Sequence, residues 1–191
     1  MNYFRLRPCI GVGNKWVLGD VDHVDNWLFI QPPVNFMEPG RYSLQVKHDG
    51  AQRDFSLAGY ASVPIVSARF RNALEGLPEV DEPHANTVME PVVIEGQRAR
   101  GSYFVLIVET CVDCVDESRS AFEKFERDDP VRPDLAGQYR AFAKLVLDGG
   151  KVGSWHIFRL GGFGAALIVS EEVKSRLERA GVTDVIFEQV G

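Results

Sequence analysis

The chain has 191 residues, of which 45% are hydrophobic and 25% are charged, as in an ordinary soluble globular protein. Acidic side chains outnumber basic ones by 27 to 21, which gives a formal net charge of -6 at pH 7. This excess weighs against binding nucleic acid, because affinity for phosphates depends on Lys and Arg, and it favours a basic protein partner. The length predicts a single domain over residues 1–191, with a β-rich part over residues 1–60 and a second part over residues 61–191.

The three cysteines, Cys9, Cys111 and Cys114, are odd in number, which argues against the disulfide framework of a secreted protein. Arg5 and Arg7 near the N-terminus are not followed by an apolar stretch of the length of a signal peptide. No run elsewhere approaches the length needed to cross a bilayer. We therefore expect a reduced, cytoplasmic protein that does not associate with a membrane.

Strand patterns dominate the first sixty residues. Runs of aromatic and β-branched side chains predict short strands at residues 3–6, 16–18 and 27–30. Residues 41–47 alternate between apolar and polar side chains, as a half-buried strand does. The His-Asp-Gly sequence at residues 48–50 then predicts a hairpin turn.

An internal repeat relates residues 64–77 to residues 167–180. Each copy has an Ile-Val strand end, then a serine (Ser67 or Ser170), and then a short helix with one apolar face. A serine hydroxyl in this position accepts a hydrogen bond from an N–H group of the first helical turn, which explains both serines without catalysis. Each helix is expected to lead back to a strand, at residues 91–94 and 184–187.

The second half of the chain mixes both kinds of element. Residues 102–108 are the strongest candidate for a buried strand, and the apolar spacing over residues 118–126 predicts a short amphipathic helix. Residues 142–147 are predicted to be a strand, followed by a hairpin at residues 148–150 that leads into residues 152–160. The fold class is therefore α+β: a mixed, mostly antiparallel sheet, a few short covering helices and two related strand–Ser–helix–strand units.

Cys111 and Cys114 have the C-x-x-C spacing of a redox dithiol or of half a zinc site. They follow a predicted strand, as a thioredoxin-like pair does, so a thiol redox or metal-binding protein is one alternative function. A zinc site needs two more ligands, and neither Cys9 nor the four histidines provide a pair at ligand spacing. The favoured interpretation is two small buried thiols at a strand end, and no cofactor.

The remaining motifs do not predict catalysis. Residues 20–25 hold three aspartates and a histidine, but a calcium loop over residues 20–31 would have Asp25 in place of its glycine and Gln31 in place of its glutamate. We therefore expect a solvated turn or strand edge there. His156 lies in a strand-like run and can act as a general base only if a nucleophile faces it. No catalytic or metal-binding residue is predicted.

Carboxylates are concentrated between residues 113 and 129, where seven acidic side chains accompany three basic ones. The commonest role of such a run is a solvated helix face and loop. The functional interpretation is an electrostatic docking surface for a basic partner. The predicted partner-binding residues are Asp113, Asp116, Glu117, Glu123, Glu126, Asp128 and Asp129.

Taken together, the sequence resembles a family of bacterial immunity proteins from polymorphic and contact-delivered toxin systems. This family was first catalogued as a domain of unknown function and has a myxobacterial prototype. The likeness covers most of the chain and rests on several short segments rather than on one motif. These segments are residues 3–6, 64–67 with the helix after them, 114–118, 157–160, 167–170 and 180–187.

The resemblance implies a cytoplasmic, non-enzymatic protein, encoded beside a toxin gene, that neutralises its cognate toxin by binding it. The family offers no established catalytic residues to transfer to this sequence. Two alternatives remain open at this point. The first is the redox or metal-binding protein that would use Cys111 and Cys114, and the second is an adaptor or structural subunit.

Overall fold

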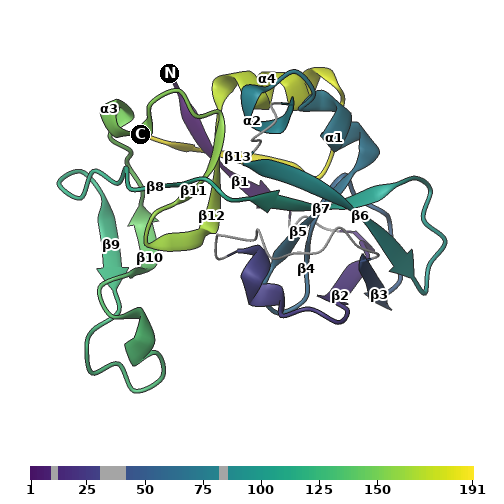
Figure 1. The fold of residues 1–191 in the computed structure, drawn as a ribbon, viewed down its shortest axis with the longest axis horizontal. Coiled ribbons are helices and arrows are strands. Elements are labelled where there is room, and N and C mark those ends of the chain that lie inside the picture. The colour runs from purple at the N-terminus through teal and green to yellow at the C-terminus, as the bar shows by residue number, and fades with distance from the viewer. Residues whose placement is uncertain (10–12, 31–41, 82–85) are drawn as a thin grey trace.

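The computed structural model describes residues 1–9, 13–30, 42–81 and 86–191. Within these residues, strands form two sheets and a separate two-stranded ribbon, with the short α-helices along the upper side of the view (Figure 1). Two predicted features extend outside the described residues, at Arg41 of the strand over residues 41–47 and at Gln31 of the rejected calcium loop. The predominance of strands over a few short helices confirms the α+β class.

The six-stranded sheet curls until its two outer strands meet. Its order is β2-β3-β6-β7-β5-β4, and the backbone N–H of Gly59, after β4, donates to the Leu18 carbonyl of β2 at 3.1 Å. Fully buried side chains such as Leu44, Val63 and Val105 fill the interior of this curled sheet. The strands are β2 (Val17–Val21), β3 (Tyr42–His48), β4 (Phe55–Ala58), β5 (Val63–Ser67), β6 (Thr87–Glu95) and β7 (Tyr103–Val108).

The five-stranded sheet has the order β13-β1-β12-β11-β8. β1 lies between β12 and β13 and is antiparallel to both, whereas β11 and β8 are parallel to each other. Most neighbours are therefore antiparallel in this sheet. The strands are β1 (Tyr3–Pro8), β8 (Cys111–Val112), β11 (Ile157–Leu160), β12 (Phe163–Ser170) and β13 (Val185–Val190).

The two predicted serines begin the two longest helices of the described chain. The Ser67 hydroxyl accepts from the Phe70 N–H at 3.3 Å and starts α1 (Ala68–Ala73). The Ser170 hydroxyl accepts from the Val173 N–H at 3.4 Å and starts α4 (Glu171–Arg179). Both serines therefore act as N-caps, as predicted. The path from α1 back to β6 contains one element that the sequence did not predict, α2 (Pro78–Asp81).

A shared apolar core joins the two sheets to α1 and α4. It includes Phe4 from β1, Phe70 from α1, Phe104 from β7 and Leu177 from α4, all buried. The Phe70 ring stacks on Phe55 with the centroids 5.9 Å apart and 21° between the planes. Burying large aromatic side chains contributes a large part of the stability of such a core.

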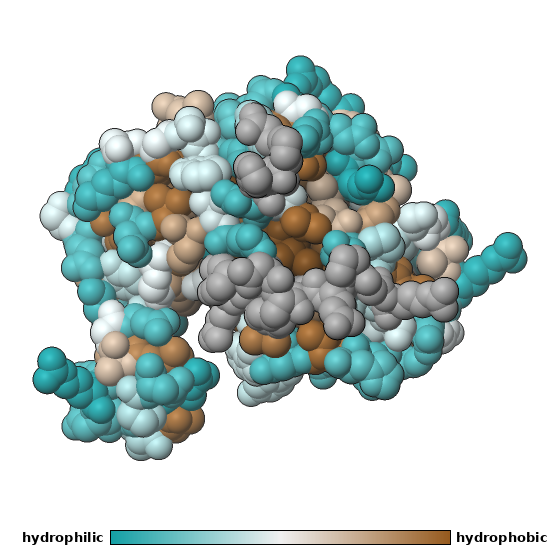
Figure 2. All heavy atoms as spheres, viewed as in Figure 1, coloured by the Kyte–Doolittle hydropathy of each residue, from teal (hydrophilic) through white to brown (hydrophobic). Residues whose placement is uncertain are grey.

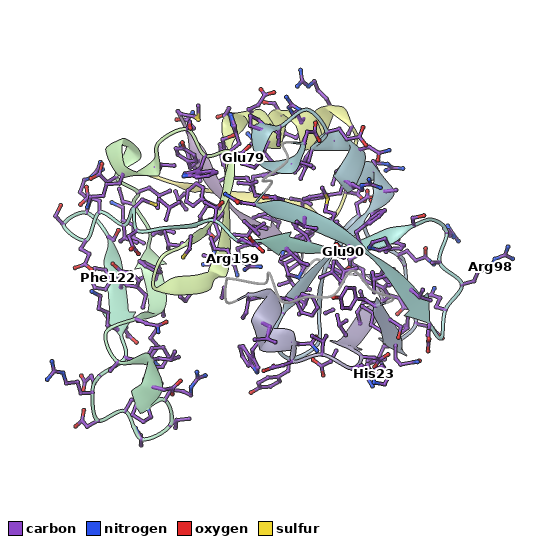
Figure 3. The ribbon with its side chains drawn as sticks, viewed as in Figure 1. His23, Glu79, Glu90, Arg98, Phe122 and Arg159 are labelled. Atoms are coloured by element: carbon purple, nitrogen blue, oxygen red, sulfur yellow. The ribbon has the colours of Figure 1, made fainter. Side chains whose placement is uncertain are left out.

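A buried arginine forms a second connection between the parts of the fold. Arg159 on β11 is 1% exposed and lies near the middle of the molecule (Figure 3). Its guanidinium donates to three backbone carbonyls, those of Val108 at 3.2 Å, Gly164 at 2.7 Å and Phe29 at 3.1 Å. Among the described residues no carboxylate forms an ion pair with it, and burial lowers the pKa of Arg159 to about 10.

The predicted strand at residues 27–30 is wrong. Asn26–Phe29 is a 3-10 helix, η1, which begins after Asp25. The Asp25 carboxylate accepts from the Trp27 N–H at 3.1 Å and so satisfies a backbone donor at the start of the helix. The aromatic run that suggested a strand is divided instead between an exposed Trp27 and a buried Phe29.

The predicted helix at residues 118–126 is also wrong. The segment contains β9 (Ala121–Lys124), which pairs in antiparallel fashion with β10 (Tyr139–Lys144). The strand predicted at residues 142–147 therefore begins earlier and ends earlier than expected. A short 3-10 helix, η2 (Pro133–Leu135), lies in the connection between the two strands.

Neither predicted hairpin turn forms. Asp148 caps α3 (Gly149–Val152), because its carboxylate accepts from the Gly150 N–H at 3.0 Å. Residues 48–50 do not return β3 to an adjacent strand, since β3 pairs with β2 and β6. Gly50 is required there by close packing, because a Cβ atom on it would lie 2.3 Å from the carbonyl carbon of Lys15.

Candidate functional site

Residues 116–145 form an arm that projects from the body of the molecule (Figure 1). The arm consists of β9, β10 and the connection that contains η2. At its base, the Asp116 N–H donates to the Val146 carbonyl at 2.9 Å, and the Tyr139 N–H donates to the Gly162 carbonyl at 2.9 Å. The arm is therefore attached at one end only, and most of its side chains are exposed.

A small aromatic cluster holds the base of the arm. Phe122 and Phe142, on its two strands, both approach Tyr139, with centroid distances of 5.1 and 4.7 Å. Phe142 also contacts Phe163 of β12 in the body at 5.3 Å. The Lys124 ammonium lies 4.8 Å from the Tyr139 centroid, where a cation interacts favourably with the ring. These contacts give the arm a fixed attachment to the five-stranded sheet.

Three of the seven predicted carboxylates are already in ion pairs inside the arm. In Asp116, hydrogen bonds from Ser118 and Arg119 lower the pKa to about 2. Glu117 also accepts from the Tyr139 hydroxyl at 2.6 Å. The three pairs are Asp116 with Arg119 at 2.5 Å, Glu117 with Lys124 at 2.6 Å and Asp129 with Arg140 at 3.3 Å.

The other four predicted carboxylates lie in two places. Glu123, Glu126 and Asp128 are exposed, form no ion pair among the described residues, and line an open cleft of about 630 Å³ on the arm. Asp113 lies apart from them and lines a second cleft of about 420 Å³ with Tyr139. The structure therefore brings only part of the predicted set together.

Folding reduces the local charge that the sequence suggested. The return strand, β10, brings Arg140 and Lys144 beside the acidic run, and the connection before it adds Arg132. Over residues 113–145 there are eight acidic and six basic side chains. Figure 2 shows polar and apolar residues mixed over the arm. The unpaired acidic surface is therefore smaller than residues 113–129, and it is centred on Glu123, Glu126 and Asp128.

Cys111 and Cys114 differ from each other in exposure. Cys111 lies exposed on β8, and Cys114 is fully buried beyond it. Desolvation and the nearby Asp113 raise the pKa of both thiols, that of Cys114 to about 11. A redox dithiol needs the opposite shift. Among the described residues there is also no cluster of three or more His, Cys, Asp or Glu side chains that could hold a metal ion.

We expect both thiols to react slowly at neutral pH. A raised pKa leaves each thiol protonated, so its rate of alkylation rises with pH instead of levelling off near pH 7. In the folded protein Cys114 is also shielded from reagent. Labelling with iodoacetamide between pH 6 and 10, with Cys111→Ser and Cys9→Ser variants to assign the sites, measures this. A thiol that reaches its full rate below pH 8 would contradict the expectation.

His156 does face a hydroxyl, but the pair has a structural role. Its Nδ1 lies 2.9 Å from the Ser170 Oγ, a distance at which a general base can form a hydrogen bond with a nucleophile. Ser170, however, is fully buried and is occupied as the N-cap of α4. The Glu79 carboxylate accepts from the His156 backbone N–H at 2.5 Å, so it does not orient the imidazole ring. The three groups therefore tie α2, β11 and α4 together.

An exposed aromatic pair was missed by the sequence analysis. Trp27 on η1 and Tyr60 in the turn after β4 are 41% and 88% exposed, and their ring centroids are 6.3 Å apart. The short strand predicted at residues 27–30 does not indicate that Trp27 is exposed. The sequence signal for the exposure of Trp27, though not for its contact with Tyr60, is Asp25-Asn26 immediately before it, since both residue types favour the start of a helix.

No helix of the described residues is long and apolar enough to cross a membrane. No curated protein matches the chain. A family model does: the immunity protein family, Imm11, matches residues 26–191. The matched span includes both strand–Ser–helix–strand units, the C-x-x-C pair and the whole arm. Because the match extends over most of the sequence, this chain belongs to the immunity protein family Imm11.

Proposed function

We propose that this protein neutralises a cognate toxin in the cytoplasm by binding it, without catalysis. Membership of an immunity family supports the neutralising role. The raised pKa values of Cys111 and Cys114 and the structural use of Ser170 argue against the enzymatic alternatives. A binding mechanism needs a surface of about 800 Å² on each partner, with a small number of residues supplying most of the affinity.

The observation that carries the proposal is the projecting arm. An element attached at one end only can enter a concave site on another protein, while the body blocks access around it. Its unpaired carboxylates, Glu123, Glu126 and Asp128, lie on one open cleft and would pair with Lys or Arg side chains of the partner. The proposed partner is therefore a toxin with a basic surface, and neither a nucleic acid nor a membrane.

Asp116, Glu117 and Asp129 have a different proposed role. Their ion pairs with basic residues of the arm fix its shape and are expected to contribute little to attraction of the partner. Asp113 lies near the base of the arm, where it would meet only the rim of an interface. Within the predicted partner-binding set, we therefore assign most of the electrostatic attraction to the unpaired three.

The test is binding of the toxin encoded by the adjacent gene. Reversing two unpaired charges, Glu123→Lys with Glu126→Lys, is expected to slow association about tenfold and to weaken its salt dependence, because these charges steer the encounter. Asp49→Lys with Glu75→Lys changes the net charge equally on the body and is the matched control. Stopped-flow or surface plasmon resonance measurements at several salt concentrations supply the rates.

Two outcomes oppose the proposal at different levels. Equal association rates for the arm variant and the body control would show that the arm is not part of the interface. Failure of the unaltered protein to bind the toxin, together with failure to protect cells that express it, would refute the immunity mechanism itself.

A further inference from the structure

The exposed pair of Trp27 and Tyr60 has the composition of an interaction site. The rings meet edge to face, with 77° between their planes, and Tyr60 is almost fully exposed. Trp and Tyr are enriched among the residues that dominate binding energy at protein interfaces. Neither ring is needed to fill the interior of the six-stranded sheet, which is packed by other side chains.

Carboxylates are held at the backbone of both aromatic residues. The Asp25 Oδ1 accepts from the Trp27 backbone N–H at 3.1 Å, and the Asp20 Oδ1 accepts from the Tyr60 backbone N–H at 2.9 Å. Asp22 lies between them in sequence and accepts from a serine hydroxyl at 3.0 Å. None of these three aspartates is in an ion pair with any residue that the structure describes.

We propose that this aromatic–acidic surface, formed by Asp20, Asp22, Asp25, Trp27 and Tyr60, binds an arginine side chain of a protein partner. A guanidinium stacks on an aromatic face and at the same time donates N–H groups to carboxylates at its edge. Lysine fits less well, because its ammonium is compact, strongly hydrated and unable to stack. The surface thus has both components that a guanidinium needs.

The surface lies apart from the arm. His23, in the turn that carries the aspartates, and Phe122, in the arm, occupy different parts of the molecule (Figure 3). In the space-filling view the arm extends away from the body, with open space between them (Figure 2). The arginine is proposed to belong to the toxin, so this inference rests on the proposed function. It adds a second contact, on the six-stranded sheet, to the contact made by the arm.

Charge favours a protein partner over a membrane surface. Exposed Trp and Tyr also occur in proteins that bind lipid headgroups. The carboxylates bound to the backbone of these two residues would be repelled by anionic lipids, whereas a basic protein segment is attracted to them. Phosphatidylcholine vesicles supply the test of this choice: co-sedimentation of the protein with them, lost in a Tyr60→Ala variant, would overturn the proposal.

Affinity for the toxin tests the surface directly. Tyr60→Ala and Asp25→Asn are each expected to raise the Kd at least about tenfold, since the first removes a ring and the second a charge. Tyr60→Phe keeps the ring and is expected to stay within about twofold of the unaltered protein. Ile186→Ala, at an exposed apolar residue of β13 in the body, is the matched truncation. Unchanged affinity of Tyr60→Ala and Asp25→Asn would overturn the inference and leave the arm proposal standing.

An arginine peptide tests the chemistry without the toxin. We would titrate the ¹⁵N-labelled protein with acetyl-Gly-Arg-Gly-amide and with its lysine counterpart, and follow the Trp27 indole N–H by NMR. The Trp27 signal is expected to move more with the arginine peptide, and to move less in the Asp20→Asn, Asp25→Asn double variant. A Trp27 signal that does not move, or responds equally to both peptides, would overturn the inference. If the unaltered protein fails to bind toxin, the proposed function fails, and this titration still decides whether the surface takes arginine.

Discussion

Replacing Arg159 with methionine is expected to lower the free energy of unfolding by about 3 to 5 kcal/mol, which is a large part of the stability of an ordinary domain. The guanidinium is buried and donates to the carbonyls of Val108, Gly164 and Phe29. Methionine fills part of the volume but donates to none of them. Each buried carbonyl that loses a donor costs free energy, and each had gained from a charged donor.

Urea denaturation followed by circular dichroism measures this loss. Arg159→Lys keeps the charge but has no planar fork, so it cannot serve three carbonyls in different directions and is also expected to be less stable. Arg179→Met, at an exposed position of α4, is the matched control and is expected to change stability by no more than about 0.5 kcal/mol. An Arg159→Met protein as stable as this control would show that the buried hydrogen bonds add little.

Phe70→Ala is expected to lower the free energy of unfolding by about 3 to 5 kcal/mol, because it empties a fully buried site between α1 and both sheets. The variant also loses the stacked contact with Phe55. Since the surrounding strands are fixed by their hydrogen bonds, they relax only partly into the space. The residual cavity adds to the loss of apolar burial.

The matched aromatic truncation is Tyr60→Ala, at a side chain that is 88% exposed. It is expected to change stability by no more than about 0.5 kcal/mol. Thermal or urea unfolding of both variants gives the comparison, and a Phe70→Ala loss below about 1 kcal/mol would contradict the placement of Phe70 in the shared core. The same control shows that a binding defect of Tyr60→Ala is not a folding defect.

The sequence predicted correctly those elements that depend on interactions between residues close together in the chain. An N-cap serine needs only a free N–H two or three residues ahead, so Ser67 and Ser170 were identified correctly. Residues 102–108 were identified as a buried strand because every side chain from Tyr103 to Val108 is apolar or aromatic. The α+β class followed from these elements together.

Non-local pairing explains the main errors. The apolar spacing of Ala121, Phe122 and Phe125 fits a helix, but β9 is fixed by its pairing with β10, across a connection that contains η2. The same pairing places Arg140 beside Asp129. The acidic run was therefore visible in the sequence, whereas its partial neutralisation was not.

The aromatic pair could not be predicted for a similar reason. Tyr60 lies more than thirty residues from Trp27, and the two meet only because β2 and β4 come together when the six-stranded sheet curls. A tryptophan in an apolar run is expected to be buried, unless another signal, such as the start of a helix, indicates that it is exposed. Asp25 supplies that start, and the exposure of Trp27 follows from it.

The position of β1 determines the order in which the protein can assemble during synthesis. Tyr3 pairs with Ser170 on one side and with Val190 on the other, so β1 leaves the ribosome long before either partner exists. The strands of the six-stranded sheet all lie within residues 17–108 and become available much earlier. Until β12 and β13 emerge, both edges of β1 are unpaired, which is the condition in which nascent strands aggregate. β1 therefore waits for partners that are synthesised much later, and the five-stranded sheet can be completed only after β12 and β13 have emerged.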